Sequence, residues 1–241
     1  MLPLQDLNPT RRTPVLTYGL IAINVLVFFW QLGLSERELQ QTFETLAIVP
    51  ANVTANPFSL ETVLDFLRSM FFHGGWDHIL GNMLYLWLFG DNVEDRLGEI
   101  LYLVLYFGSG FVAGIAQILI NPDSTIPMIG ASGAIAGVLG AYLVLFPGVK
   151  VRGIIPLGRI GAMQEWPAVI VLGMWFILQL VNGVASLGPQ SQYGGGVAFF
   201  AHVGGFIAGA IFAWLLTRAM PQPPADQRRE MLYERARRYT L

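Results

Sequence analysis

Long apolar stretches recur along this chain, and they constrain its fold more than any other feature. A helix needs about 20 predominantly apolar residues to cross a bilayer core of roughly 30 Å. We count six candidate stretches and expect each to form a membrane-spanning helix: 16–33, 78–90, 100–120, 132–146, 166–184 and 198–216. The sequence therefore predicts an all-α polytopic membrane protein, a bundle of six transmembrane helices in a lipid bilayer.

Composition supports this assignment and excludes other classes of protein. Hydrophobic residues make up 54% of the 241 residues and charged residues 12%, whereas a typical soluble domain has about 25% charged residues. A net charge of −2 gives no basis for binding nucleic acid. The chain has no cysteine, which excludes disulfides, thiol catalysis and cysteine-ligated metals. We expect no metal and no other cofactor.

The basic residues predict how the chain is oriented in the membrane. With residues 1–15 in the cytoplasm, all of the 14 Lys and Arg residues except Arg37 and Arg68 fall on the cytoplasmic side. Cytoplasmic loops carry such an excess. We therefore expect a cytoplasmic N-terminal segment over 1–15, a membrane domain over 16–218 and a cytoplasmic tail over 219–241. A compact chain without a transit peptide favours the bacterial inner (plasma) membrane.

Two connections on the outer side have distinct patterns. The long outer loop 34–77 has apolar residues at helical spacing: Leu60, Leu64, Leu67 and Phe71. This pattern predicts an amphipathic helix that lies in the membrane interface. The outer connection 185–197 has several glycines and no charge. We expect it to be mobile. It lies directly before the span that carries His202, and we hypothesise that it is a flexible cover that keeps lipid out and admits substrate and water.

Polar side chains inside a span are costly, so each one is a candidate for function. The three histidines and one serine fall at or near the outer ends of predicted spans: His73, His78, His202 and Ser132. The stretch 132–146 would extend about 22 Å as a helix at roughly 1.5 Å per residue. Ser132 should therefore lie several Å below the outer surface. His202 is about one turn into the last span, so the two side chains can meet at similar depth.

Ser132 has two interpretations at this point. A serine hydroxyl becomes an effective nucleophile when a base lies within hydrogen-bond distance, and His202 or His78 could be that base. Alternatively, Ser132 only fills a helix contact, because small residues such as Gly133 and Gly137 recur on the same helix and favour close packing.

His78 and Asn82 are four residues apart and therefore share one face of a helix. Both side chains can donate hydrogen bonds. Together with the backbone N–H of Ser132, they could form an oxyanion hole. The alternative is a pair of polar side chains bonded to each other at the start of the span.

Four motifs occur together: HGGWDHILGNM at 73–83, VEDRLG at 93–98, GASGA at 130–134 and AHVGGFIAG at 201–209. In these motifs and their order the chain resembles the rhomboid family of intramembrane serine proteases, over roughly 16–218. The GxSG pattern alone would be a weak signal, because it also marks a strand-to-helix elbow in soluble hydrolases. The four motifs together are highly specific.

The resemblance implies roles for the matched residues. Ser132 would be the nucleophile, and His202 would be the general base and later the general acid. His78 and Asn82 would stabilise the oxyanion. His73 matches a further histidine position, for which the resemblance implies a structural role.

One position departs from the family pattern. Some members carry an aromatic residue one turn after the serine, where it stacks on the histidine, but here that residue is Ala136. Another group must therefore orient the histidine, and the sequence offers Phe199 and Phe200 as aromatic candidates. The Glu94-x-Arg96 pair, in contrast, matches a structural motif of the family.

The resemblance implies a reaction, which is hydrolysis of a peptide bond in a transmembrane segment of a partner protein, near the outer face. Carbonyls in such a helix are already hydrogen-bonded, so we expect substrates with helix-weakening Gly or Pro in the outer part of the span. The alternative is a catalytically inactive rhomboid-like protein that binds transmembrane helices, although such a protein usually lacks the serine or the histidine. A small transporter or channel would need charged residues or broken helices near the midplane, and the sequence has neither.

Overall fold

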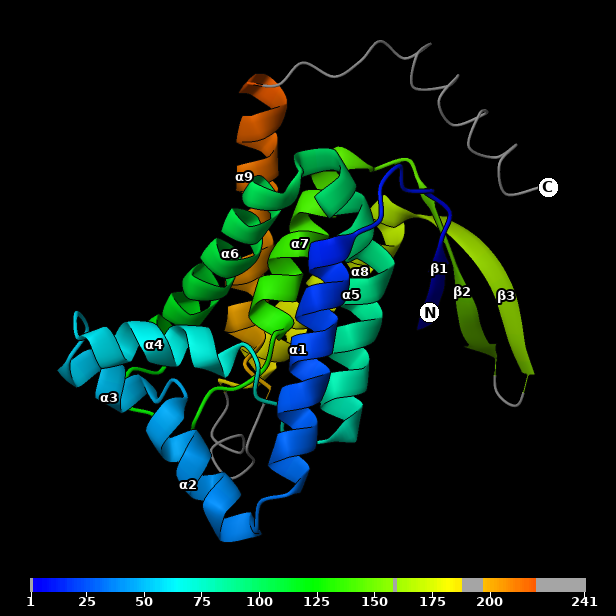
Figure 1. Ribbon diagram of the computed structural model, residues 1–241. Coiled ribbons are helices and arrows are strands. Elements are labelled where there is room, and N and C mark those ends of the chain that lie inside the picture. The colour runs from blue at the N-terminus through cyan, green and yellow to red at the C-terminus, as the bar shows by residue number, and fades with distance from the viewer. Residues whose placement is uncertain (1, 158–159, 188–196, 220–241) are drawn as a thin grey trace.

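The structure is a computed structural model that describes residues 2–157, 160–187 and 197–219. Its bundle contains the predicted helices: α1 (Val15–Leu32), α5 (Trp76–Leu97), α6 (Glu99–Ile120), α7 (Ser132–Leu145), α8 (Ala168–Ala185) and α9 (Phe199–Ala219). Figure 1 shows their arrangement. Nearly all of the predicted tail 219–241 and most of the connection 185–197 lie outside the described residues. The proposed gate therefore stays a prediction.

Four helices of the described chain are long and apolar enough to cross a membrane: α1, α6, α8 and α9. α7 is apolar but shorter, with 14 residues. α5 has 22 residues and extends to Leu97, beyond the expected end at Gly90. The hydropathy pattern missed this extension because the last turns of α5 carry charged side chains. The chain is a polytopic integral membrane protein whose membrane domain is a helical bundle.

α7 lies at the centre of the bundle, where α5, α6 and α9 pack around it. The range Gly133–Tyr142 is buried throughout. Glycines let the backbones of α7 and α9 touch: a Cβ at Gly140 would collide with the carbonyl oxygen of Phe206, and one at Gly209 with that of Gly137. The small residues of α7 are thus used for packing, as in other close helix contacts in membranes. This contact fixes α9 against α7.

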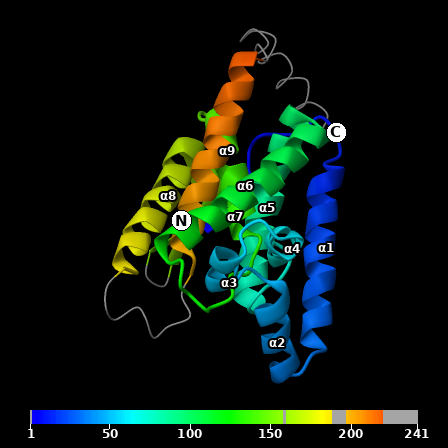
Figure 2. The same ribbon diagram turned by 90° about the vertical axis from the view of Figure 1, so that its left-hand side faces the viewer.

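α8 lies at the edge of the bundle, on the opposite side from α1 (Figure 2). Only Ala168, Leu172 and Gly183 are buried in it, and its main neighbour is α9. Apolar side chains that cover the rest of this helix are exposed at the protein surface. In a bilayer most of the surface of α8 would therefore face lipid.

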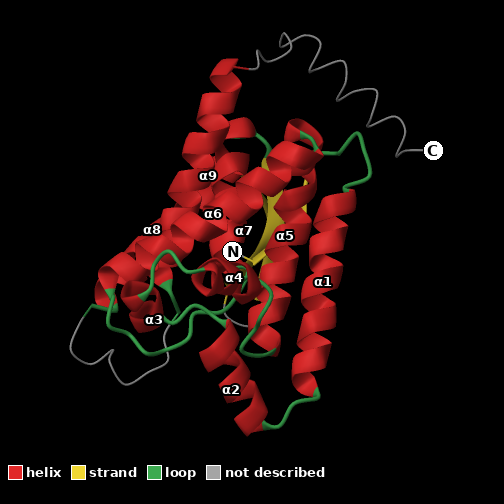
Figure 3. Ribbon diagram, turned by 60° about the vertical axis from the view of Figure 1, so that its left-hand side comes forward, coloured by secondary structure: helices red, strands yellow, loops and turns green. Residues whose placement is uncertain are grey.

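The sequence analysis did not predict a three-stranded antiparallel sheet, which joins the bundle at the end where α7 ends and α8 begins. The strands lie alongside the bundle helices (Figures 1 and 3). Its strands are β1 (Leu2–Asp6), β2 (Lys150–Leu157) and β3 (Ile160–Pro167), in the order β1-β2-β3. Asp6 pairs with Val151, and Lys150 pairs with Pro167. The N-terminal segment and the connection between α7 and α8 therefore lie side by side. We call this end of the bundle the sheet end.

Three helices occupy the predicted long loop at the opposite end, which we call the serine end: α2 (Glu36–Leu46), α3 (Pro50–Ala55) and α4 (Leu60–Ser69). α4 is the predicted amphipathic helix, and it lies crosswise to the bundle helices (Figure 1). Its N-terminus is capped by the Ser59 hydroxyl, which accepts a hydrogen bond from the backbone of Thr62. α2 and α3 were not predicted. α2 begins with a capping box between Ser35 and Glu38.

Candidate active site

Ser132 is the first residue of α7, and the backbone just before it requires glycine. Gly130 has φ +122°, in the region that side chains disfavour. A Cβ at this position would also lie only 2.6 Å from Nε2 of His78. Gly130 therefore allows both the turn into α7 and the close approach of the α5 side chains to it.

The structure brings Ser132 and His202 together. His202 lies in the first turns of α9, and its Nε2 is 2.8 Å from Oγ of Ser132. Only 9% of His202 is exposed. The direct backbone contact between α7 and α9 sets this pair, because it leaves little freedom for one helix to shift against the other. A serine bonded to a shielded imidazole is an arrangement that can activate a nucleophile.

The other ring nitrogen of His202 contacts a residue that the sequence analysis missed. Nδ1 lies 2.8 Å from Oε1 of Gln179 on α8. The ring of Trp175, one turn earlier on α8, lies 5.9 Å from the His202 ring at an interplanar angle of 37°. α8 therefore supplies these contacts, and the expected candidates Phe199 and Phe200 do not. The available signal was Gln179 itself, a polar side chain within an apolar span.

His78 and Asn82 both approach Gly130 from α5. The backbone N–H of Gly74 donates to Nδ1 of His78 over 3.3 Å. This contact favours a neutral ring protonated at Nε2, which is the nitrogen nearer Gly130. Nδ2 of Asn82 is buried and has no hydrogen-bond partner among the described residues. The two side chains are therefore not a mutually bonded pair. They are two donors directed toward the backbone that precedes Ser132.

The start of α7 adds backbone donors to the same place. The first N–H groups of a helix have no partner within it, and the helix dipole favours negative charge at this end. Ser132 occupies the first position, so its own N–H is one of these donors. Side chains of α5 and the N-terminus of α7 thus surround a point that could hold an oxyanion.

His73 lies outside the bundle helices, in the segment that leads into α5. Its ring is almost fully buried and meets the ring of His78 edge to face at 5.0 Å. Burial lowers the pKa of His73 to about 4, so the ring is neutral near pH 7. Its backbone is held by Gln31 of α1, whose side chain donates to the carbonyl of His73 (2.9 Å) and accepts from its N–H (3.1 Å).

Glu94, in the charged last turns of α5, forms hydrogen bonds to the start of α1. Its buried carboxylate accepts from the backbone N–H groups of Leu16 (2.9 Å) and Thr17 (2.7 Å), and from the hydroxyl of Thr17 (2.7 Å). These groups are in the first turn of α1, where a carboxylate is favourable. Glu94, of the motif that contains Arg96, thus joins α5 to α1 at the sheet end.

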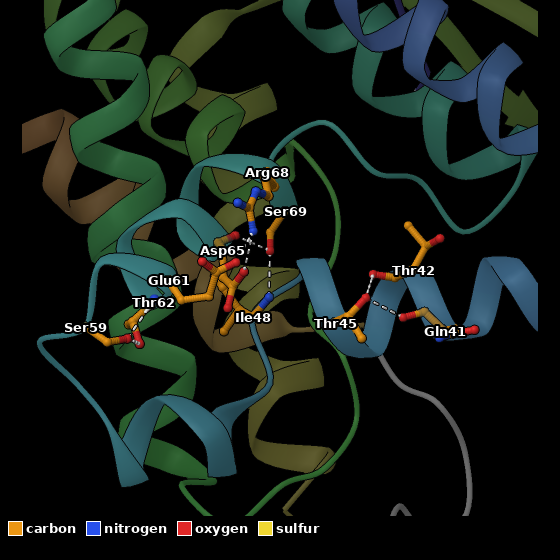
Figure 4. Close-up of polar contacts among 10 residues, drawn as sticks. All are labelled: Gln41, Thr42, Thr45, Ile48, Ser59, Glu61, Thr62, Asp65, Arg68 and Ser69. Atoms are coloured by element: carbon orange, nitrogen blue, oxygen red, sulfur yellow. Dashed lines mark hydrogen bonds and ion pairs between the residues drawn. The ribbon is translucent and has the colours of Figure 1, made fainter.

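Hydrogen bonds from the loop helices hold the segment that precedes Ser132. The Ser69 hydroxyl, at the end of α4, accepts from the backbone N–H of Ile48 (2.7 Å) and donates to the carbonyl of Asp65 (2.6 Å) (Figure 4). The carbonyl of Ser69 accepts from the N–H of Gly130 (2.8 Å), and that of Ile48 accepts from Met128 (2.7 Å). The loop helices therefore fix the backbone two residues before the serine.

A small cavity of about 40 Å³ lies between Ser132 and α4. Ser69, Gly110, Gly114 and Gly130 contribute to its lining. The volume is sufficient for one or more water molecules, since roughly 10–15 Å³ in this measure holds one. Among the described residues, no cluster of His, Asp and Glu side chains could hold a metal ion.

The structure thus defines a polytopic helical membrane protein that buries a hydrogen-bonded Ser–His pair. The family model described as the Rhomboid domain matches residues 60–219, more than half of the chain. The chain therefore belongs to the rhomboid family. This family includes intramembrane serine proteases as well as inactive members.

Several curated proteins are similar to this chain. Rhomboid protein 1, mitochondrial, of Saccharomyces cerevisiae is 28% identical over 210 residues, which cover 85% of this chain and 54% of the relative. Rhomboid-like protein 11, chloroplastic, of Arabidopsis thaliana is 27% identical, and the match covers 67% of this chain and 55% of the relative. Rhomboid protease AarA of Providencia stuartii is 28% identical, and the match covers 82% of this chain and 71% of the relative. The chain spans about half the length of the first two relatives.

Proposed function

We propose that this protein is an intramembrane serine endopeptidase that cleaves transmembrane segments of other membrane proteins by a Ser–His dyad. The observation that carries the proposal is the 2.8 Å contact between Oγ of Ser132 and Nε2 of His202. The amide nitrogen of Asn82 supports the same assignment, because it approaches Gly130 from α5 and could donate to an oxyanion beside Ser132.

The proposed reaction has two stages. Oγ of Ser132 attacks the substrate carbonyl while Nε2 of His202 takes the hydroxyl proton, and the carbonyl oxygen becomes an oxyanion. Donors from His78, Asn82 and the N-terminus of α7 stabilise that charge. The proton then passes from His202 to the leaving amine, and an ester to Ser132 remains. Water, deprotonated by His202, hydrolyses the ester and releases the second product.

The proposed substrates are transmembrane helices that unwind near the site. Every backbone carbonyl in an intact helix is already bonded within it, so Ser132 can attack only after local unwinding. The polar groups around Ser132 reduce the cost, because they offer partners to the freed N–H and C=O groups. We therefore propose that Gly or Pro near the cut site favours cleavage.

We further propose that the sheet end is cytoplasmic and that the site lies near the outer face of the membrane. Antiparallel pairing of β1 with β2 places Lys150 and Arg152 at the same end as the N-terminal segment. This arrangement agrees with the excess of basic residues expected on the cytoplasmic side. The plasma membrane of a bacterium remains our proposed location, while the names of the relatives also include mitochondrial and chloroplast proteins.

A labelling experiment tests the proposed function. A fluorophosphonate probe should label the purified protein at Ser132, and a transmembrane substrate with a Gly-containing outer half should be cleaved. Ser132→Ala and His202→Ala should each abolish both, and the double variant should be no worse than either single variant, because each residue serves the same step. Binding of the substrate without labelling or cleavage in the wild type would instead support the inactive, helix-binding alternative.

A further inference from the structure

We propose that Gln179 is a positioning residue that holds His202 in the tautomer required for catalysis. This inference rests on the proposed function. Oε1 of Gln179 lies 2.8 Å from Nδ1 of His202, and Oγ of Ser132 lies 2.8 Å from Nε2. The imidazole is therefore held at both nitrogens, by α8 on one side and by α7 on the other.

The chemistry of a neutral imidazole makes the partner at Nδ1 decisive. One ring nitrogen carries the proton and donates, while the other accepts. Ser132 can lose its proton to His202 only if Nε2 is the acceptor, so the ring proton must sit on Nδ1. The carbonyl oxygen of an amide accepts and cannot donate. A Gln179 oxygen at Nδ1 therefore favours the ring form that Ser132 needs.

An amide suits this place in the membrane better than a carboxylate. Most of the surface of α8 consists of exposed apolar side chains, which would face lipid in a bilayer. An ionised side chain on this helix would therefore be costly. A neutral amide supplies the acceptor without a net charge. Trp175 and Gln179 are four residues apart on α8 and therefore face the same side, so the indole contacts the ring that the amide holds. Among the described residues, the titratable group whose charge acts on His202 is His78 on α5.

Three variants separate this role from general packing. Gln179→Met keeps the length of the side chain but removes the amide acceptor, whereas Gln179→Glu keeps an acceptor. Asn182→Leu is the matched control, because Asn182 lies three residues further along α8 and is exposed. Rates of fluorophosphonate labelling and of substrate cleavage are measured for each variant between pH 5 and pH 9.

We expect Gln179→Met to slow both rates by roughly 10- to 100-fold, the effect of one buried donor left without its partner. Gln179→Glu should retain most of the wild-type rate at pH 8. The acid limb of its pH profile should move to higher pH, because a carboxylate stabilises the protonated ring. Asn182→Leu should match the wild type. The proposal would be overturned if Gln179→Met reacted as fast as the wild type. It would also be overturned if Gln179→Glu were as slow as Gln179→Met and its acid limb did not move.

A second measurement does not depend on activity. The chain has three histidines, so ¹⁵N-histidine labelling gives a simple NMR spectrum, in which His202→Ala identifies the His202 signals. The wild type should show the ring protonated at Nδ1, and Gln179→Met should lose this preference. A wild-type ring protonated at Nε2 would refute the role of Gln179 even if the enzyme is active. An inactive wild type with the expected tautomer would contradict the proposed function alone.

Discussion

The side chain of Asn82 is buried in α5, and its amide nitrogen has no partner among the described residues. An oxyanion beside Gly130 would give this amide an acceptor, because the amide nitrogen approaches Gly130 from α5. His78 lies beside it with its Nδ1 occupied by Gly74 and its Nε2 nearer the backbone of Gly130.

We expect Asn82→Ala to lower kcat by about 10²–10³, the usual effect of losing one oxyanion donor, with little change in KM. Steady-state cleavage of a transmembrane substrate measures both constants. Leu80→Ala is the control, since Leu80 lies on the same helix with an exposed side chain. An unchanged kcat together with a lower Tm would instead assign Asn82 a purely structural role.

At the scale of elements, the start of α9 is held by a side chain from another helix. Oε1 of Gln117, near the end of α6, accepts from the backbone N–H groups of Phe200 (3.1 Å) and Ala201 (3.3 Å). Both donors lie in the first turn of α9, where N–H groups have no partner within the helix; the N–H of Ala201 also donates to the carbonyl of Ala198, which precedes the helix (3.0 Å). The cap lies directly before His202, so it fixes the backbone that carries the imidazole.

We expect Gln117→Met to lower the stability of the bundle by roughly 1 kcal/mol, as loss of an N-terminal cap does. Labelling at Ser132 should slow as well, because the first turn of α9 gains freedom. Its pH profile should keep the wild-type shape, in contrast to Gln179→Glu. Thermal unfolding in detergent and probe labelling measure these effects. Gln117→Glu retains an acceptor and should restore both properties, so a Glu variant as impaired as the Met variant would contradict the capping role.

For the molecule as a whole, Asp6 couples the sheet to the bundle. Nδ2 of Asn92 in α5 donates to Oδ2 of Asp6 over 2.6 Å, and the N–H of Asn8 donates to Oδ1. Burial raises the pKa of Asp6 from 3.8 to about 8, and the nearby charge of Asp91 adds to this effect. The folded protein therefore favours the protonated carboxyl.

The sign of the pH dependence follows from linkage. The folded state binds the Asp6 proton more tightly than the unfolded chain, so its contribution to stability is complete below about pH 4 and is lost as the pH rises through about 8. We expect the Tm of the wild type to fall over this window. Asp6→Asn cannot ionise and should show a flatter profile, with a higher Tm than the wild type above pH 8. Parallel Tm profiles for the two proteins between pH 5 and pH 9.5 would show that Asp6 is not the group responsible.

Predictions from sequence succeeded where the signal was local. Apolar stretches located the helices of the bundle, because a span must be apolar whatever its neighbours are. The charged last turns of α5 were missed. The helix over 60–69 was found from its amphipathic spacing. The sheet was missed because β1 gains its structure from β2, and the paired residues Gln5 and Arg152 are far apart in the chain. No local pattern in either segment indicates that it pairs with the other.

For the candidate site, the sequence by itself predicted that Ser132 and His202 lie at similar levels near the same ends of their spans, since helical rise and span direction set the expected levels. Only the tertiary structure decided which side chains touch. Gln179 reaches His202 because α8 packs against α9, and the contact between α7 and α9 depends on glycines that admit a neighbouring backbone. Depth is a property of one helix, whereas contact depends on the rotation and spacing of two helices, which their combined packing sets.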